Sequence, residues 1–305
     1  MNKNDYLAQI ISRRNSYMQG LDISQITDKP RNRHYDEMIK SAVKDKVCAD
    51  VGFGSGILTM MALKHGAKHV YAYEMHPSTY DFGKAIVEDI RASEYFRRYR
   101  RPAENVTFIN ERFTGKEKVD IVIHEILMRS VWGEGLYEVY KLVDKKAHIL
   151  PGKMTVKILC CEDQDYTYFC NGDDAMHLDL GVDYLKPFHD TWYDLNSSEE
   201  YFSAWPAIGR TGEQLKNTIH KIEDHFTRQI GEYVVDLNND DIPEIIEVEV
   251  DVPKNSIVTI RAWANDFQIV RADGYCNWYP EKIICVSEGG RKTFHHRTSD
   301  GAWYF

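Results

Sequence analysis

The sequence predicts an α/β domain with a mostly parallel sheet, followed by a domain of antiparallel sheet or β-barrel. Up to Leu150, short apolar runs alternate with amphipathic stretches of helix length, a pattern typical of parallel sheets covered by helices. After a break at Pro151 and Gly152, β-rich segments follow one another through irregular loops. The 305 residues also exceed the about 100 to 200 residues of one domain. We therefore expect domains at 1–150 and 151–305.

The composition excludes several classes of function. Hydrophobic residues make up 43% of the chain, enough for a large core. The 38 Lys and Arg against 47 Asp and Glu give a net charge of -9, which disfavours binding to nucleic acid. The basic run at 97–101 is interpreted as solvated surface, as a single short charge run usually is. No apolar run approaches the roughly 18 residues of a membrane span, and no apolar leader follows the first residues, so neither membrane insertion nor secretion is expected.

The six cysteines show no CxxC pair. We expect reduced thiols and a cytoplasmic location, or a nuclear one in a eukaryotic cell. The adjacent His295 and His296 have no Cys or carboxylate at metal-ligand spacing, so no metal site is expected.

Four strands and three helices are predicted in the first domain, after an N-terminal helical segment. The strands are expected at 46–54, 68–74, 105–110 and 118–125, and the helices at 55–66, 78–90 and 136–149. Ligands of such sheets bind beyond the carboxyl ends of the strands. The residues that follow each strand are therefore the first candidates for a site.

The second domain is predicted to contain strands at 153–163, 244–253, 256–264 and 281–288. Between the first two lies an excursion at 166–233. It is expected to contain one helix, which a capping box of Thr211 and Gln214 begins. Its apolar stripe is formed by Leu215, Ile219, Ile222, Phe226 and Ile230. The stripe fits packing onto the barrel of the same chain or, alternatively, a contact between subunits.

The strongest local signal is a glycine-rich turn after the first strand, with Asp50, Gly52, Gly54 and Gly56. Glycines permit a tight turn and a close approach of the backbone to a ligand. Their spacing departs from the dinucleotide fingerprint, since the third glycine comes one position early. Glu74 ends the next strand, where a carboxylate accepts two ribose hydroxyls. These features predict a ligand with a ribose but no phosphate, for which S-adenosylmethionine is the common candidate.

Two glutamates follow the fourth strand. Glu125 comes directly after it, and Glu134 stands nine residues later, before a predicted helix. Two carboxylates at that edge could hold a guanidinium, whose planar fork of donors pairs bidentately with carboxylates. Taken singly, each residue also fits a role without function in a binding site, as a solvated loop charge or as a charge favoured by a helix N-terminus.

With these features the chain resembles the protein arginine methyltransferases. The likeness rests on the glycine turn, Glu74, the paired Glu125 and Glu134, and the β-barrel half, and it is strongest over 28–150. The sequence GEG at 133–135 is more similar to the monomethylating and duplicated branch. The resemblance implies a Rossmann-like methyltransferase domain, S-adenosylmethionine as cofactor, an arginine-containing protein substrate and a homodimer, with 166–233 as the candidate dimerisation arm.

The resemblance also implies roles for single residues. The glycine turn with Asp50 would hold the methionine end of the cofactor, Glu74 its ribose, and Arg31 its carboxylate. Met75 and Phe113 would flank the adenine. Glu125 and Glu134 would be the catalytic pair. Cys276, Asn277 and Trp278 stand where the family has a Thr-His-Trp loop that closes the arginine pocket, so Asn277 replaces the family's His and Trp278 remains as an apolar wall.

Three alternatives remain at this stage. A catalytically silent homologue acting as a scaffold is favoured by Asn277 and by the missing spacing of an N-terminal Tyr motif, for which Tyr6 and Tyr17 are the candidates. A methyltransferase for a small molecule or another side chain would use the two glutamates to bind a different cation. A nicotinamide enzyme is disfavoured by the glycine spacing.

Overall fold

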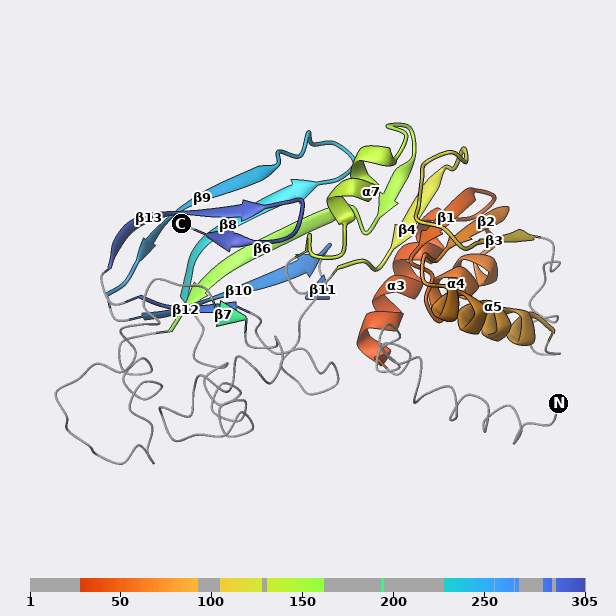
Figure 1. Cartoon of the computed structure of the whole chain (residues 1–305), viewed down its shortest axis with the longest axis horizontal. Coiled ribbons are helices and arrows are strands. Elements are labelled where there is room, and N and C mark those ends of the chain that lie inside the picture. Colours follow the sequence, from red (N-terminus) through yellow and green to blue (C-terminus); the bar gives the residue numbers. More distant parts are fainter. Residues whose placement is uncertain are drawn as a thin grey trace, which may run out of the picture. The chain divides into compact units, whose positions relative to one another are not determined.

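The computed structural model describes the chain as two compact units (Figure 1). It describes residues 28–92, 105–127, 131–161, 193–194, 228–254, 256–265, 267–268, 282–286 and 289–304. The N-terminal unit contains the described residues up to Ile126 together with Tyr137–Gly152. The C-terminal unit contains Leu127–Leu136 and the described residues from Lys153 onward. The stretch 127–136, which includes Glu134, thus groups with the C-terminal unit.

A five-stranded parallel sheet forms the centre of the N-terminal unit, with the strand order β3-β2-β1-β4-β5. Its strands are β1 (Val47–Val51), β2 (His69–Tyr73), β3 (Val106–Ile109), β4 (Ile121–His124) and β5 (His148–Leu150). The order reverses at β1, which lies between β2 and β4, so the carboxyl ends of β1, β2 and β4 are neighbours. The α/β fold class predicted for this region is confirmed.

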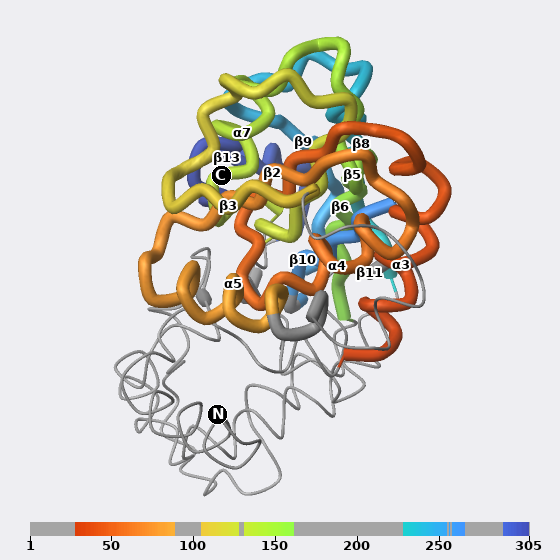
Figure 2. The backbone as a smooth tube through the Cα atoms, turned by 90° about the vertical axis from the view of Figure 1, so that its right-hand side faces the viewer, coloured from red at the N-terminus to blue at the C-terminus, as the bar shows by residue number. Residues whose placement is uncertain are grey.

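Helices α3 (Lys29–Ala42), α4 (Ile57–Lys64) and α5 (Pro77–Ala92) lie on one face of this sheet (Figures 1 and 2). The start of α3 is defined by Asp28, whose carboxylate accepts a hydrogen bond from the Arg31 amide at 3.0 Å, and by Pro30 in the first turn.

The helix predicted at 136–149 is shorter than expected. Helix α7 spans Leu136–Leu142, and β5 follows at His148. A turn separates the two, because Asp144 accepts hydrogen bonds from the Lys146 amide through its carboxylate and from the Ala147 amide through its carbonyl. The sequence reasoning joined a short helix and a short strand into one helix, since three residues of strand carry too little periodicity to be recognised.

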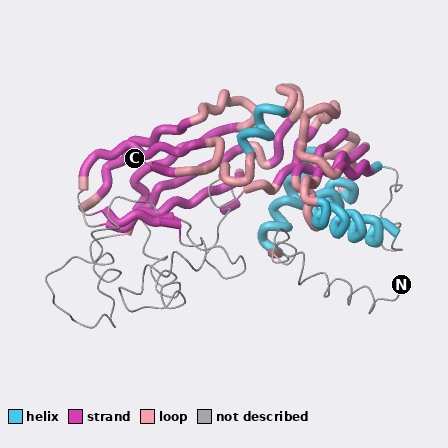
Figure 3. The backbone as a smooth tube through the Cα atoms, viewed as in Figure 1, coloured by secondary structure: helices cyan, strands magenta, loops and turns pink. Residues whose placement is uncertain are grey.

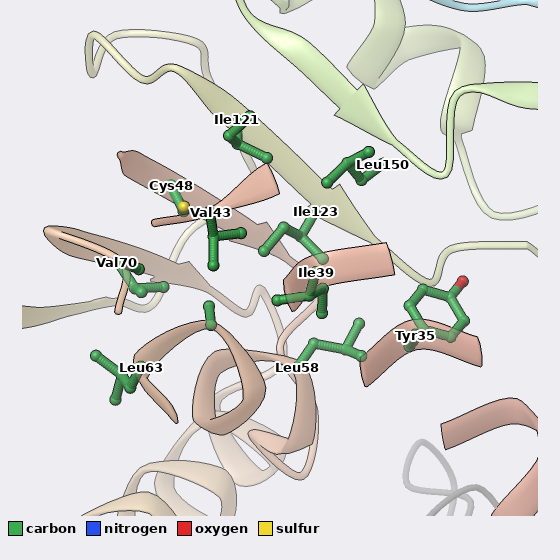
Figure 4. Close-up of a cluster of buried hydrophobic side chains, with 12 residues drawn as sticks. Tyr35, Ile39, Val43, Cys48, Leu58, Leu63, Val70, Ile121, Ile123 and Leu150 are labelled. Carbon is green, nitrogen blue, oxygen red and sulfur yellow. The ribbon is translucent and has the colours of Figure 1, made fainter. Parts of the chain in front are cut away.

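The core of the N-terminal unit lies between the sheet and helices α3 and α4. Figure 4 shows Ile39 from α3 and Leu58 from α4 facing Ile123 from the sheet, and all three are buried. In parallel strands covered by helices, buried residues form near-continuous apolar runs, as the first three of the four buried residues of β4 do. This packing fixes the strand ends from which the candidate site residues project.

The C-terminal unit is built mainly from strands (Figure 3). These strands pair in antiparallel fashion. A six-stranded sheet contains the path β7-β12-β10-β6-β8 with β11 paired to β10, and a three-stranded sheet has the order β14-β13-β9. The strands are β6 (Lys153–Cys160), β7 (Tyr193–Asp194), β8 (Arg228–Asp236), β9 (Ile245–Val252), β10 (Ser256–Ala264), β11 (Phe267–Gln268), β12 (Lys282–Val286), β13 (Gly290–Arg297) and β14 (Trp303–Tyr304).

Antiparallel pairing in this half agrees with the predicted class, and β9 alternates strictly between buried and exposed residues. One expectation was wrong. Ile230, predicted in a helix, lies in strand β8, where Gly231 approaches the side chains of β9 so closely that a Cβ would stand 2.4 Å from Val250. Tertiary packing therefore overrides the helical spacing at Ile230. The rest of that predicted helix lies outside the described residues, as do most of the excursion, Asn277 and Trp278.

The contact between α5 and the glycine turn generates a first prediction. A Cβ at Gly83 would stand 1.9 Å from the Gly54 carbonyl oxygen and 2.6 Å from the Phe53 ring. Since backbone must move to make room, Gly83→Ala is expected to lower the free energy of unfolding by about 1 to 3 kcal/mol in urea denaturation. The exposed Glu88 on the same helix provides the control, because Glu88→Ala should change it by less than about 0.5 kcal/mol. Equal stability of the two variants would contradict the close packing.

Candidate cofactor-binding site

The turn after β1 takes its shape from its glycines. Gly52, Gly54 and Gly56 have φ angles of 73°, 51° and 79°, in the left-handed region where a Cβ is unfavourable. At Gly56 space is also restricted, because a Cβ would stand 2.2 Å from a methyl group of Val87 on α5. The Gly52 and Phe53 amides both donate to the Tyr73 carbonyl at 2.9 Å. The turn is therefore held against the end of β2.

Glu74 directly follows β2 and contacts this turn. One carboxylate oxygen accepts a hydrogen bond from the Gly54 amide at 3.3 Å, and the other accepts one from the His76 amide at 2.9 Å. Asn110, after β3, donates its side-chain amide to the Glu74 carbonyl at 2.8 Å. The side chain is buried and its orientation is fixed, yet each carboxylate oxygen has further acceptor capacity. The structure thus brings together the acidic residue and the glycine turn, which the sequence predicted to belong to one ligand site.

Asp50, the last but one residue of β1, is fully buried. Its Oδ2 accepts a hydrogen bond from the Thr59 hydroxyl on α4 at 2.6 Å. Its Oδ1 is buried with no hydrogen-bond partner among the described residues. Burial raises the pKa of Asp50 to about 7, against the opposing effect of the Thr59 hydrogen bonds. An unsatisfied buried carboxylate oxygen at a strand end fits a site that receives a cationic group.

Arg31 and Glu125 are paired with each other. Arg31 Nε donates to Glu125 Oε1 at 3.2 Å, and Nη2 lies 2.9 Å from Oε2, which is the bidentate geometry of an arginine and a carboxylate. The two side chains are 7% and 20% exposed. Burial acts to lower the pKa of Arg31, but the charge and hydrogen bond of Glu125, together with the charges of Tyr35 and Asp28, outweigh it, and the pKa is raised. Two residues assigned separate roles from the sequence therefore form one ion pair.

Tyr35 supports this ion pair. The Arg31 guanidinium lies over the Tyr35 ring, 5.3 Å from its centroid, and the Tyr35 hydroxyl donates to the His124 carbonyl at 3.2 Å. The residue before Glu125 is thereby tied to α3. Tyr35, Thr59 and Asn110 were not identified from the sequence. The spacing of Tyr35 four residues after Arg31 on a helix is the one signal that could have indicated it.

The remaining predicted residues differ in their surroundings. Phe113 is buried with its ring against that of Tyr73, edge to face at 5.2 Å, whereas Met75 is 48% exposed next to Glu74. Glu134 is exposed in the turn before α7. Asn277 and Trp278 lie outside the described residues.

The described part of the chain contains no group of three or more His, Cys, Asp or Glu side chains arranged to hold a metal ion. Likewise, none of the helices within the described ranges has the length and apolar character needed to cross a membrane.

Known proteins match part of this chain in sequence. A family model described as ribosomal protein L11 methyltransferase (PrmA) matches residues 33–152. Protein arginine N-methyltransferase 1.1 of Arabidopsis thaliana is 29% identical over 155 residues, which cover 48% of this chain and 38% of the relative. Protein arginine N-methyltransferase 1 of Saccharomyces cerevisiae is 33% identical over 155 residues, covering 48% and 42%. The match spans less than half the length of either relative.

Among solved structures, the Trypanosoma brucei PRMT1 enzyme-prozyme heterotetrameric complex with AdoHcy is similar to 94% of this chain and to 88% of its own chain. The TM-score is 0.55 and the sequence identity is 16%, so this likeness concerns the fold. The resemblance to the protein arginine methyltransferases is confirmed. In sequence the two relatives match 48% of this chain, and in fold the solved structure matches 94% of it.

The buried Asp50 predicts a pH dependence of stability that a methyltransferase-like domain with a solvated carboxylate there would lack. The unfolded carboxyl titrates near pH 4, and the folded one at about 7. Between these values the folded state retains a proton that the unfolded state loses, so this group removes stability as the pH rises, at up to about 1.4 kcal/mol per pH unit.

Asp50→Asn cannot titrate, so its unfolding free energy relative to the wild type should rise between pH 4 and pH 7. Urea denaturation of both proteins across this range measures the difference. The buried His124, whose pKa is lowered to about 4 by burial, acts in the opposite direction but equally in both proteins. Asp81→Asn, at an exposed position of α5, is the control. A difference that stays constant with pH would show that Asp50 is ionised in the folded state.

Proposed function

We propose that this protein is an S-adenosylmethionine-dependent protein arginine N-methyltransferase. The observation that carries the proposal is the Glu125 carboxylate, which holds the Arg31 guanidinium in a bidentate pair directly after β4. A carboxylate placed in this way can bind the guanidinium of a substrate. The similarity in sequence to curated arginine methyltransferases and in fold to solved ones supports this choice of substrate class.

The residues around the glycine turn fit S-adenosylmethionine. This cofactor, when bound, supplies an electrophilic methyl group on a sulfonium. Glu74, with acceptor capacity on both oxygens, would bind the ribose hydroxyls. The unsatisfied Asp50 Oδ1 provides an acceptor for the ammonium group of the methionine end, with Gly52, Gly54 and Gly56 giving access to the backbone. Arg31 would bind the carboxylate, and Met75 and Phe113 would flank the adenine.

Glu125 and Glu134 would orient the substrate guanidinium. A guanidinium delocalises its charge and is a weak nucleophile, so the protein has to position one nitrogen and return electron density to it. Two carboxylates can do both, and one can accept the departing proton. Since Glu125 is already paired with Arg31, binding of a substrate arginine requires Glu125 to share or exchange this partner.

Several features of the whole protein belong to the same proposal. Asn277 and Trp278 would border the arginine pocket, and the chain would form a homodimer through 166–233. The GEG sequence at 133–135 favours monomethylation. A cytoplasmic location, or a nuclear one in a eukaryote, is proposed from the composition.

Cofactor binding can be tested at Glu74. Glu74→Gln keeps the shape of the side chain but loses the charge that ribose hydroxyls would contact, so the Kd for S-adenosylhomocysteine in calorimetry should rise by about tenfold or more. Glu37→Gln, at an exposed position of α3, is the matched control and should bind as the wild type does. Unchanged affinity in Glu74→Gln would remove Glu74 from the cofactor site.

Substrate chemistry can be tested at Glu134. Methyl transfer from labelled S-adenosylmethionine to a Gly-Arg-rich peptide, followed by hydrolysis and amino-acid analysis, should give methylarginine. Glu134→Gln should lower kcat by about 100-fold or more while the Kd for the cofactor stays unchanged. The exposed Glu232 provides the control, Glu232→Gln.

Each other outcome of this experiment identifies a different function. Label on another residue or on a small molecule would favour a methyltransferase of different specificity. Cofactor binding without transfer to any peptide or lysate protein would favour a scaffold. The ratio of monomethylarginine to dimethylarginine tests the proposed similarity to the monomethylating branch of the arginine methyltransferases.

A further inference from the structure

A chain of hydrogen bonds leads from the turn that carries Glu134 into the C-terminal unit. Trp132 stands two residues before Glu134 and is fully buried, whereas Glu134 is exposed. The Trp132 indole nitrogen donates to the Tyr233 hydroxyl on β8 at 3.1 Å. The Tyr233 oxygen lies 2.7 Å from Nδ1 of His296 on β13, and His296 is fully buried. All four residues belong to the same unit.

One proton position in this hydrogen-bond chain follows from the donors. An indole nitrogen can only donate, so the Tyr233 oxygen accepts from Trp132. The Tyr233 oxygen and His296 Nδ1 share a second hydrogen bond, in which the tautomer of His296 decides which group donates. Burial raises the pKa of Tyr233, which keeps the hydroxyl protonated. Both bonds use the Tyr233 hydroxyl group, so removing it leaves the Trp132 indole without this acceptor.

This hydrogen-bond chain joins two sheets that no strand pairing connects within the described ranges. Strand β8 belongs to the six-stranded sheet and β13 to the three-stranded sheet, so the bond from Tyr233 to His296 joins the two sheets. His296 is further fixed by Trp303, its partner residue on β14, whose ring stacks on the imidazole at 4.0 Å. Trp132 adds the turn to this rigid pair of sheets.

The turn itself is strained. Val131 has a φ angle of 67° and is fully buried. A β-branched residue in the left-handed region is an outlier that persists only where the surrounding structure holds it, and such residues concentrate at functional sites. The turn ends at Gly135, whose amide donates to the Trp132 carbonyl at 3.3 Å. Held at both ends, the turn presents Glu134 at its exposed side.

We propose that Tyr233 and His296 are positioning residues, which act through Trp132 to fix the turn 131–135 and thereby the place of Glu134. The inference rests on the proposed function, in which Glu134 binds the substrate guanidinium. A carboxylate that orients a nucleophile contributes much less to the reaction rate when it is displaced even slightly from the nucleophile. The geometry of the turn therefore sets the rate of transfer.

Hydrogen exchange tests the anchoring without any measurement of activity. In Tyr233→Phe the ring is kept and the hydroxyl is lost, so amide exchange in a peptide covering 131–136 should accelerate by about tenfold. Peptides from the N-terminal unit should exchange as in the wild type. Tyr304→Phe, on the exposed side of β14, is the matched control and should leave exchange at 131–136 unchanged. Unchanged exchange in Tyr233→Phe would overturn the proposal.

Kinetics tests the consequence for turnover. Tyr233→Phe should lower kcat for peptide methylation by about tenfold, with an unchanged Kd for the cofactor. His296→Asn retains an acceptor near the place of Nδ1 and should keep more activity than His296→Leu, although both lose the ring. His295→Asn, on the neighbouring residue of β13, should behave as the wild type does. Equal activity of His296→Asn and His296→Leu, or a wild-type kcat in Tyr233→Phe, would contradict the positioning role.

Failure of the proposed function is distinguishable from failure of this inference. A wild-type protein that makes no methylarginine contradicts the function, and with it the catalytic part of the inference. A wild-type protein that makes methylarginine, together with a fully active Tyr233→Phe, contradicts the inference alone.

Discussion

The attachment of the glycine turn to the end of β2 is the constraint on which the candidate cofactor site depends. Two backbone amides of the turn donate to the Tyr73 carbonyl, and a third donates to the Glu74 carboxylate. The turn makes these bonds with positive φ angles at Gly52 and Gly54, which favour glycine at both positions. The same turn geometry also determines where the Glu74 carboxylate lies. One local geometry thus fixes both the backbone and the acidic group that a ribose-containing ligand would contact.

Charge, more than shape, distinguishes this site from the surrounding core. The apolar cluster under the sheet packs as in any α/β domain, but Asp50 and Arg31 are buried within a few residues of it. Burial of a charged group is costly unless it is paired or hydrogen-bonded. Arg31 meets this cost through Glu125, whereas Asp50 satisfies one oxygen through Thr59 and its other oxygen has no hydrogen-bond partner in the described part of the chain. Such an imbalance is typical of a group retained for binding rather than for stability.

Sequence reasoning predicted what is periodic or punctuated by glycine and missed what depends on long-range packing. Strands β1 to β4 and the turn after β1 were predicted because apolar runs and glycines define them locally. Strand β5 was missed since three residues carry no period. Ile230 was placed in a helix from its local spacing, whereas it lies in strand β8, which pairs with the distant strand β6. The bond from Thr59 to Asp50 and the ion pair of Arg31 and Glu125 join residues 9 and 94 positions apart, which no local pattern reveals.

The two glutamates proposed to bind the substrate are close in sequence, yet different sets of contacts support them. Glu125 follows β4 of the N-terminal unit and is held by Arg31, which Tyr35 supports. Glu134 belongs to the C-terminal unit, where Trp132 anchors its turn. A spacing of nine residues therefore describes the motif without explaining it. Each carboxylate depends on its own set of contacts, so a substitution in one set can alter one carboxylate and leave the other in place. Such selectivity lets the contributions of the two glutamates to binding and to turnover be separated.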